Sequence, residues 1–314
     1  DIDKNKLYSF MREMEFNRLL SSVISFYGEA GFSDDKIKNK PTDKFSKINN
    51  NNYELINNEE EINHWLTEAE ETGEIAIDTE TTSLDPHQAE LVGISLSTAI
   101  GKSCYIPLGH KTGKNLNEKN IIKKIKTVLE DKSIKKIGQN IKFDFIVLYH
   151  RGIEMNSMED TMLMSYVLDA GKNRHNMDTL SEIHLNHKTI SFKELVGSGK
   201  KQINFSEVEI NSAKNYAAED ADITYRLYKI FTQSLKNEKL TSIYEIFEKP
   251  LIKILAFMEI NGIKVNKDFL KSLSVKFNKK IQILEKEIFK ISKKEFNIAS
   301  PKQLGEIIYN DLKI

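Results

Sequence analysis

Two carboxylates directly follow an apolar run in the segment IAIDTETTSL, residues 75–84. In a β-strand, residues i and i+2 project from the same face, so Asp78 and Glu80 point together, away from the isoleucines before them. Like charges at close range repel unless a cation lies between them, and hard divalent ions such as Mg²⁺ prefer carboxylate oxygen. An isolated pair of this kind is more often a strand end that frays into solvent. Further acids must therefore converge on it before it indicates a metal site.

A second acid stands in the segment KIGQNIKFDFIVL, residues 136–148. Asn140 and Asp144 are four residues apart at the start of an apolar helix, so they share one face of its first turn. Helix capping explains both residues, because Asn is a good N-cap and an acid suits the positive end of the helix dipole. Taken alone, this segment favours a helix-capping role for both residues over a role in catalysis or metal binding.

The third segment is NSAKNYAAEDADITYRLY, residues 211–228. Tyr216 and Asp220 are again four residues apart, on a helical stripe that we expect to face the core. A buried acid costs free energy unless a cation or hydrogen bonds compensate for it, and neighbouring alanines leave room beside it. Glu219 and Asp222 are expected to be ordinary solvated surface acids, so Asp220 stands out by its position.

Together the three segments supply four acids and one phenol: Asp78, Glu80, Asp144, Asp220 and Tyr216. In this order, DTETTSL, GQNIKFD and YAAEDAD resemble the three motifs of the DEDD exonuclease superfamily, tyrosine branch. The resemblance is strongest to the proofreading domain of the bacterial, family A DNA polymerases I. The segment TISFKELVGSGKKQINF resembles the stretch that this family places before its third motif. The likeness is close over residues 55–235 and extends to both flanks.

The resemblance implies an α/β fold, a ribonuclease H-like mixed β-sheet flanked by helices. It implies a 3′-5′ exonuclease that removes 5′-mononucleotides from DNA with two divalent metal ions, Mg²⁺ or Mn²⁺, with Zn²⁺ as an alternative at one site. Asp78 would bridge both ions, Glu80 and Asp220 would complete one site, and Asp144 would hold the second. Tyr216 would orient the attacking water, since a phenol with an ordinary pKa near 10 is a poor base at neutral pH.

The same resemblance implies contacts to the terminal nucleotide. Leu84 and Phe192 match positions that wedge against the terminal bases, Thr79 and Asn140 match positions that contact the terminal nucleotide, and Gln139 is a weaker candidate. Apolar and aromatic contact suits unpaired bases without demanding a sequence. For Leu84 and Phe192, packing in the core explains the residue type equally well.

The chain divides into three predicted parts: connector helices and a flexible linker over 1–50, the exonuclease domain over 51–235, and the truncated start of the polymerase thumb over 236–314. One or two amphipathic helices are expected over 5–27, and a polar linker over 28–52. The remaining expected elements are helices over 59–70, 118–129, 243–260 and 267–290, strands over 75–78, 91–98 and 104–108 with a hairpin turn at Gly101, and a short strand around Ile137.

Charge and cysteine content limit the functional classes. Lys plus Arg (46) equals Asp plus Glu (46), so any basic, DNA-binding surface must be local. Cys104 is the single cysteine and no signal segment opens the chain, which favours the cytoplasm. No apolar run approaches the roughly 18 residues of a membrane span. The expected partners are a single-stranded or frayed DNA 3′ end and the rest of a polymerase chain, with the protein itself a monomer.

Two other functions remain open at this point. A ribonuclease D-like RNA exonuclease shares the acids, but the thumb-like segment argues against it. A catalytically silent DNA-binding module is disfavoured because all four acids and the tyrosine are present. Polymerase activity is not expected, because the chain ends at Ile314 before a palm or fingers. His184 and His187 lack further ligands at a zinc spacing and are expected to be exposed, and GSGKK, residues 197–201, is expected to be a mobile loop.

Overall fold

The computed structural model describes residues 2–14, 16–28, 48 and 52–313. Its contacts divide the chain into two compact units, Asp1–Ile260 and Asn261–Ile314. The helices expected over 5–27 are α1 (Lys4–Glu13) and α2 (Asn17–Tyr27). Nearly all of the predicted linker over 28–52 lies outside the described residues.

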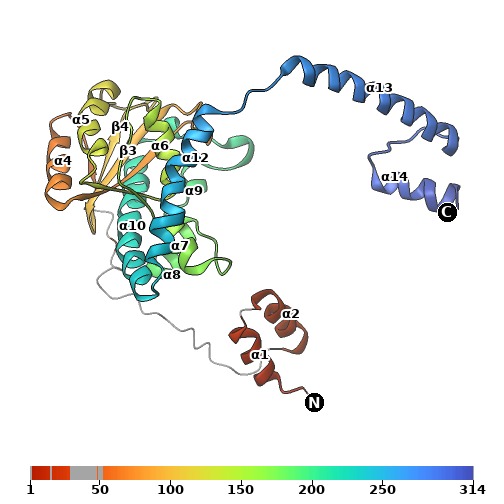
Figure 1. Ribbon diagram of the computed structural model, residues 1–314, viewed down its shortest axis with the longest axis horizontal. Helices are drawn as coiled ribbons and strands as arrows, with labels where there is room; N and C mark the ends of the chain where they lie inside the picture. The colour runs from red at the N-terminus through yellow and green to blue at the C-terminus, as the bar shows by residue number, and fades with distance from the viewer. Residues whose placement is uncertain (1, 15, 29–47, 49–51, 314) are drawn as a thin grey trace. The chain divides into compact units, whose positions relative to one another are not determined.

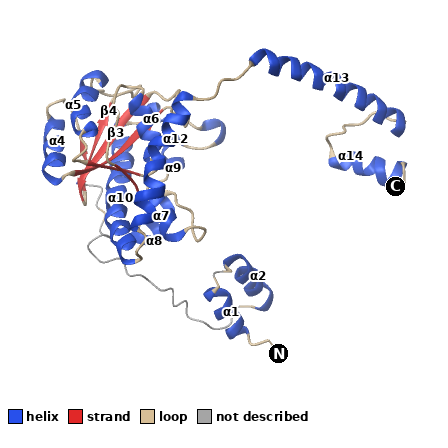
Figure 2. Cartoon of the chain, viewed as in Figure 1, coloured by secondary structure: helices blue, strands red, loops and turns tan. Residues whose placement is uncertain are grey.

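A six-stranded mixed sheet forms the centre of the first unit (Figures 1 and 2). Its order is β1-β4-β3-β2-β5-β6; β3 is antiparallel to both β2 and β4, whereas the β1–β4, β2–β5 and β5–β6 pairs are parallel. The three predicted strands and the hairpin at Gly101 are confirmed, and the short strand at Ile137 is β5. The bounds are β1 (Glu54–Leu55), β2 (Glu74–Thr81), β3 (Leu91–Ala99), β4 (Lys102–Pro107), β5 (Lys135–Gly138) and β6 (Met158–Asp160).

Helices cover both faces of this sheet (Figure 1). Trp65, Ile75 and Ile77 belong to the core on one face, under α4 (Glu61–Thr72), α5 (Glu118–Glu130), α6 (Ile141–Tyr149) and α12 (Lys249–Asn261). Ala76 faces the opposite core, built by α7 (Thr161–Asp169), α8 (Met177–Leu185) and α10 (Ile210–Asn237), with α9 (Phe192–Val196) nearby. Alternation along β2 therefore directs its even-numbered residues toward α10.

Helix α10 is the longest element of the structure and packs on β2, β3 and β4. Its N-cap is Glu209, whose carboxylate accepts a hydrogen bond from Ser212 N at 3.0 Å. Along its buried side stand alanines, which let the helix approach the sheet closely, and also several polar residues. These polar residues determine the chemistry described below.

The chain after α10 continues in the first unit. Residues 241–248 form α11 (Thr241–Ile243) and a π-helical stretch (Tyr244–Glu248), and Ile252 and Ala256 of α12 join the core under α4–α6. The second unit contains α13 (Lys267–Ser292), which matches the predicted helix over 267–290, then α14 (Pro301–Gly305) and a final π-helical stretch (Glu306–Asp311). None of the described helices is both long and apolar enough to cross a membrane.

Candidate active site

Strand β2 brings Asp78 and Glu80 to the α10 face of the sheet. In the ladder with β3, Asp78 pairs with Ser95 and Glu80 with Gly93, and the register shifts between Glu80 and Thr81. Such bulges bend a strand and re-aim its side chains, and they often lie beside active sites. The strand end therefore does not fray into solvent: Glu80 is buried, and it belongs to a regular ladder up to the bulge.

Asp220 reaches the same place from α10. One carboxylate oxygen from each of Asp78, Glu80 and Asp220 lies within 4.8 Å of the others. Tyr216, one turn earlier on α10, lies near the Asp220 carboxylate, and its hydroxyl partly offsets the rise in the pKa of Asp220. The structure thus brings together three of the four predicted acids and the predicted phenol.

Asp144 lies beside this group and not within it. Strand β5 pairs with β2 only as far as Ala76, so beyond that point the edge of β2 is free to bond another group. Asp144, in the first turn of α6, accepts hydrogen bonds there from Thr79 N at 2.9 Å and Thr79 Oγ1 at 2.6 Å. Both bonds use the same oxygen, Oδ1. The predicted contact residue Thr79 is itself buried and holds Asp144 in place.

The pKa values of all four acids are raised, mainly because the carboxylates are buried and also because other acids lie near them. Burial and the neighbouring Asp220 raise the pKa of Asp78 to about 8. Burial, then the charges of Asp78, Asp220 and Asp144, raise the pKa of Glu80 well above its ordinary value. Burial also raises the pKa of Asp220 and Asp144. These shifts reflect several carboxylates gathered in a poorly solvated place.

One atom supports a metal at this position. Glu80 Oε1 is buried and has no hydrogen-bond partner among the described residues. A buried carboxylate oxygen without a donor is costly, and a divalent cation would satisfy it together with the oxygens of Asp78 and Asp220. The donor set, oxygen only, suits Mg²⁺ or Mn²⁺.

Asp160, at the end of β6, is a site residue that sequence reasoning missed. Its carboxylate accepts hydrogen bonds from Asn140 N and Ile141 N, both at 3.1 Å, and so caps α6. The explanation of Asn140 as a side-chain cap is wrong: its backbone is left-handed (φ 60°) and its side chain makes no cap bond. Because Asn140 is exposed, its side chain can contact a ligand. The sequence signal that could have revealed Asp160 is an N-cap aspartate before Thr161.

The expectation that Glu219 and Asp222 are solvated is also wrong. Glu219 is 1% exposed and Asp222 is 0% exposed. Asp222 accepts hydrogen bonds from Arg226 Nε at 2.9 Å, Tyr53 OH at 2.9 Å and Gly101 N at 2.7 Å. Both carboxylates can be buried because donors from distant parts of the chain reach them.

His187 and His184 are likewise not exposed as expected. His187 Nε2 hydrogen-bonds Glu219 Oε1 at 2.9 Å, and the ring of His184 packs edge-on against Phe231. Both side chains are half-buried.

The predicted base contacts differ in their surroundings. Leu84 is 95% exposed, so packing in the core does not explain it. Phe192 is 43% exposed, and its ring is parallel to that of Phe205 (6.3 Å between centroids, 5° between planes) and 6.2 Å from Tyr216. Gln139 is occupied within the protein, since its amide nitrogen donates to His175 O at 2.7 Å and its oxygen accepts from Thr161. The geometry does not support Gln139 as a nucleotide contact.

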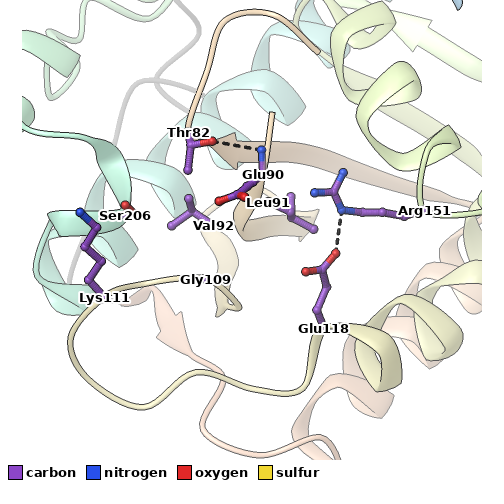
Figure 3. A pocket seen from close by; sticks show the side chains of 9 residues that line it. All are labelled: Thr82, Glu90, Leu91, Val92, Gly109, Lys111, Glu118, Arg151 and Ser206. Carbon is purple, nitrogen blue, oxygen red and sulfur yellow. Dashed lines mark hydrogen bonds and ion pairs between the residues drawn. The ribbon is translucent and has the colours of Figure 1, made fainter. Parts of the chain in front are cut away.

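A separate pocket of about 380 Å³ opens beyond the bulge of β2 (Figure 3). Arg151 and Glu118 line one side as an ion pair (2.7 Å), and Lys111 and Ser206 lie opposite. None of the four acids lines it. The pocket borders Thr82, at the base of the loop that carries Leu84.

A family model described as 3′-5′ exonuclease matches residues 53–236. The DNA polymerase I of Rhizobium leguminosarum is 42% identical over 80% of this chain and 27% of its own length. That of Pseudomonas aeruginosa is 35% identical over 99% of this chain and 35% of its own. The chain belongs to the DNA polymerase I 3′-5′ exonuclease family. It spans about a third of these relatives' length.

Solved structures confirm the ribonuclease H-like α/β fold. The POL domain of Pol1 from M. smegmatis, in complex with DNA primer-template and dNTP, superposes with a TM-score of 0.65 at 21% identity, over 83% of this chain and 41% of that chain. Brucella melitensis NrnC superposes with a TM-score of 0.51 at 24% identity, over 67% of this chain and 92% of that chain. The residues matched by the family model, 53–236, include the six-stranded sheet and the helices that carry Asp144 and Asp220.

Proposed function

We propose that this protein removes 5′-mononucleotides from the 3′ end of DNA by metal-dependent hydrolysis. The observation that carries the proposal is the group of Asp78, Glu80 and Asp220, with one Glu80 oxygen buried and unpartnered among the described residues. A chain that kept these acids only for stability would neutralise them with cations or donors. Family membership supports the same reaction.

The residues fit two divalent ions, Mg²⁺ or Mn²⁺, with Zn²⁺ as an alternative at one position. Asp78, Glu80 and Asp220 would hold one ion, and Asp144, through the oxygen not bonded to Thr79, would hold the other together with Asp78. When bound, the ions neutralise the acids, polarise the scissile phosphate and lower the pKa of a water molecule.

Tyr216 serves as an orienting hydrogen-bond donor in this proposal. Burial, followed by the charges of Asp220, Glu80 and Asp78, raises the pKa of its hydroxyl above the ordinary value. The phenol therefore keeps its proton at neutral pH and cannot act as a general base. It can donate to an oxygen of the nucleophile or substrate while its ring packs on Phe205 (6.1 Å between centroids).

Two exposed apolar side chains flank this machinery. Leu84 and Phe192 offer apolar and aromatic surface to an unpaired terminal base, with Asn140 beside the sugar and phosphate. A site that accepts only unpaired ends removes frayed, mismatched termini faster than paired ones. We therefore assign a proofreading role to residues 51–235, with residues 1–50 as connector and 236–314 as the start of the polymerase region, which would be its partner within a longer chain.

The experiment incubates the protein with Mg²⁺ or Mn²⁺ and a primer-template carrying a 3′ mismatch. We expect stepwise shortening of the primer, no shortening in EDTA, and loss of activity in Asp78→Ala. No shortening by the parent protein would leave only a silent DNA-binding module. Rapid degradation of an RNA 3′ end with DNA untouched would instead identify an RNA exonuclease.

A further inference from the structure

The Glu219 carboxylate is buried on α10, one residue before Asp220, and both of its oxygens hold the same loop. Oε1 accepts a hydrogen bond from His187 Nε2 at 2.9 Å, and Oε2 accepts one from Ile190 N at 2.7 Å. These donors belong to residues 186–191, the connection between α8 and α9. One carboxylate thus ties this loop to the helix that carries the site.

The loop leads directly into Phe192, the first residue of α9. Ser191 is the N-cap of that helix and forms a capping box with Glu194, so the orientation of Phe192 depends on the backbone before it. The amide held by Glu219 is only two residues from Phe192. The Phe192 ring in turn contacts the ring of Tyr216, which is also on α10.

The other anchors of the loop go to α8. Thr189 Oγ1 donates to Asp178 Oδ1 at 2.7 Å, and Ser181 Oγ donates to His187 O at 2.9 Å. These bonds fix the loop to its preceding helix, which itself packs on α10. Because Glu219 and Asp220 are adjacent on one helix, the Glu219 bonds add a direct link between the loop and the helix segment that carries the acid.

We propose that Glu219 is a positioning residue that holds residues 187–192 against α10, so that Phe192 meets the terminal base while the phosphate lies at the acids. The inference rests on the proposed function and deepens it. It assigns recognition of the 3′-terminal base to a hydrogen-bonded clamp, Glu219 with His187 and Ile190 N, that contributes no ligand to the metal site.

The test compares cleavage of single-stranded DNA that ends in an ordinary nucleotide with DNA that ends in an abasic residue. Glu219→Ala leaves two donors of the loop without an acceptor, so we expect kcat/KM on the ordinary end to fall about tenfold, mainly through KM. The loss on the abasic end should be much smaller. Phe192→Ala should show the same pattern of losses on the two DNA ends. The double variant should lose no more kcat/KM on the ordinary end than either single variant.

Conservative and distant changes provide the controls. Glu219→Gln should retain most of the preference, because its oxygen can accept from Ile190 N and its amide can donate to the other tautomer of His187. His187→Ala should lose less than Glu219→Ala, since the Ile190 bond remains. Glu182→Ala, at an exposed glutamate of α8, should change neither substrate.

Hydrogen exchange provides a readout independent of activity. In Glu219→Ala the amides of residues 186–192 should exchange at least about tenfold faster, while those of residues 76–80 stay unchanged. Equal kinetic losses on both DNA ends, or unchanged exchange at 186–192, would overturn the inference. A parent protein that cleaves neither DNA would refute the proposed function, whereas the exchange measurement would still decide whether the clamp exists.

Discussion

Helix α10 buries three acids within one turn, and they are compensated in opposite ways. Asp222 has an arginine, a tyrosine hydroxyl and a backbone amide, and Glu219 has a histidine and a backbone amide. Asp220 instead faces Asp78 and Glu80, with the Tyr216 hydroxyl as its favourable neighbour. All three are at most 8% exposed, so burial does not distinguish them.

This difference in hydrogen-bond partners distinguishes acids that stabilise the fold from an acid that is placed to bind a ligand. Asp222 joins α10 to the β3–β4 turn and to Tyr53, just before the first strand, and Glu219 joins it to the loop before α9. Among the residues that the structure describes, Asp220 makes no such link, and it adds repulsion to a site that already holds two acids. Uncompensated burial of this kind is how proteins pre-arrange charge for a cation, and it predicts opposite consequences of mutation within one helical turn.

The largest effect should come from Asp220. Asp220→Asn removes a ligand charge from the proposed metal site, and we expect exonuclease activity to fall about a thousandfold or more. The measurement is single-turnover cleavage of a 3′-mismatched primer in Mg²⁺. Less than a tenfold loss would mean that Asp220 is not part of the reactive group.

Asp222→Ala should affect folding instead. It would leave the Arg226 guanidinium, which is 1% exposed, without the carboxylate that it contacts at 2.9 Å, and breaking a buried pair costs about 3–5 kcal/mol of unfolding free energy. Urea unfolding measures the loss, and Asp222→Asn, which keeps an acceptor, should cost less. If Asp222→Ala lowered the unfolding free energy by less than about 1 kcal/mol, the proposed difference between Asp222 and Asp220 would be contradicted.

Stability of the metal-free protein should depend on pH through the acid group. Asp78 has a pKa of about 8 in the folded protein against an ordinary value of 3.8, so between these values the folded state binds more protons than the unfolded state. The contribution of Asp78 to stability should therefore be fully present below about pH 4 and be lost as pH rises toward 8. Urea unfolding in EDTA at several pH values measures the slope, and Asp78→Asn should flatten it. A slope that is the same in both proteins would contradict this origin.

Tyr216→Phe should give the smallest change. It keeps the ring contacts with Phe192 and Phe205 and removes only the hydroxyl near Asp220. We expect about a tenfold loss of kcat, far less than in Asp78→Ala, because an orienting bond and not a base is removed. If the two variants lost equal activity, Tyr216 would have a larger role than orientation.

Local sequence patterns predict what depends on local geometry. The spacing of Asp78 and Glu80 on a strand, and of Tyr216 and Asp220 on a helix, is enough to predict that each pair shares a direction. Such patterns cannot predict which donors compensate the buried charges of Glu219 and Asp222. Four of these donors lie 29 or more residues away in the sequence: Ile190, His187, Gly101 and Tyr53. Only the resemblance to a family, and not the spacing, brought the three segments together.

The lengths of the strands explain why the other features could not be predicted from the sequence. Strands β1 and β6 have two and three residues, too few for an alternating pattern. The bond between Thr79 and Asp144 exists because β5 stops pairing with β2 at Ala76, and the role of Asp160 arises because β6 ends beside the start of α6. Such edge effects depend on where strands end relative to one another.

Unfolding of the parent protein and of Asp220→Asn, with and without Mn²⁺ at pH 8, tests the central claim most directly. Without metal, Asp220→Asn should be the more stable protein, because a buried like charge is gone. Mn²⁺ at a hundred times its dissociation constant should stabilise the parent by about 2.7 kcal/mol and the variant much less. A variant that is less stable than the parent without metal, and equally stabilised by Mn²⁺, would show that Asp220 is a structural acid like Asp222.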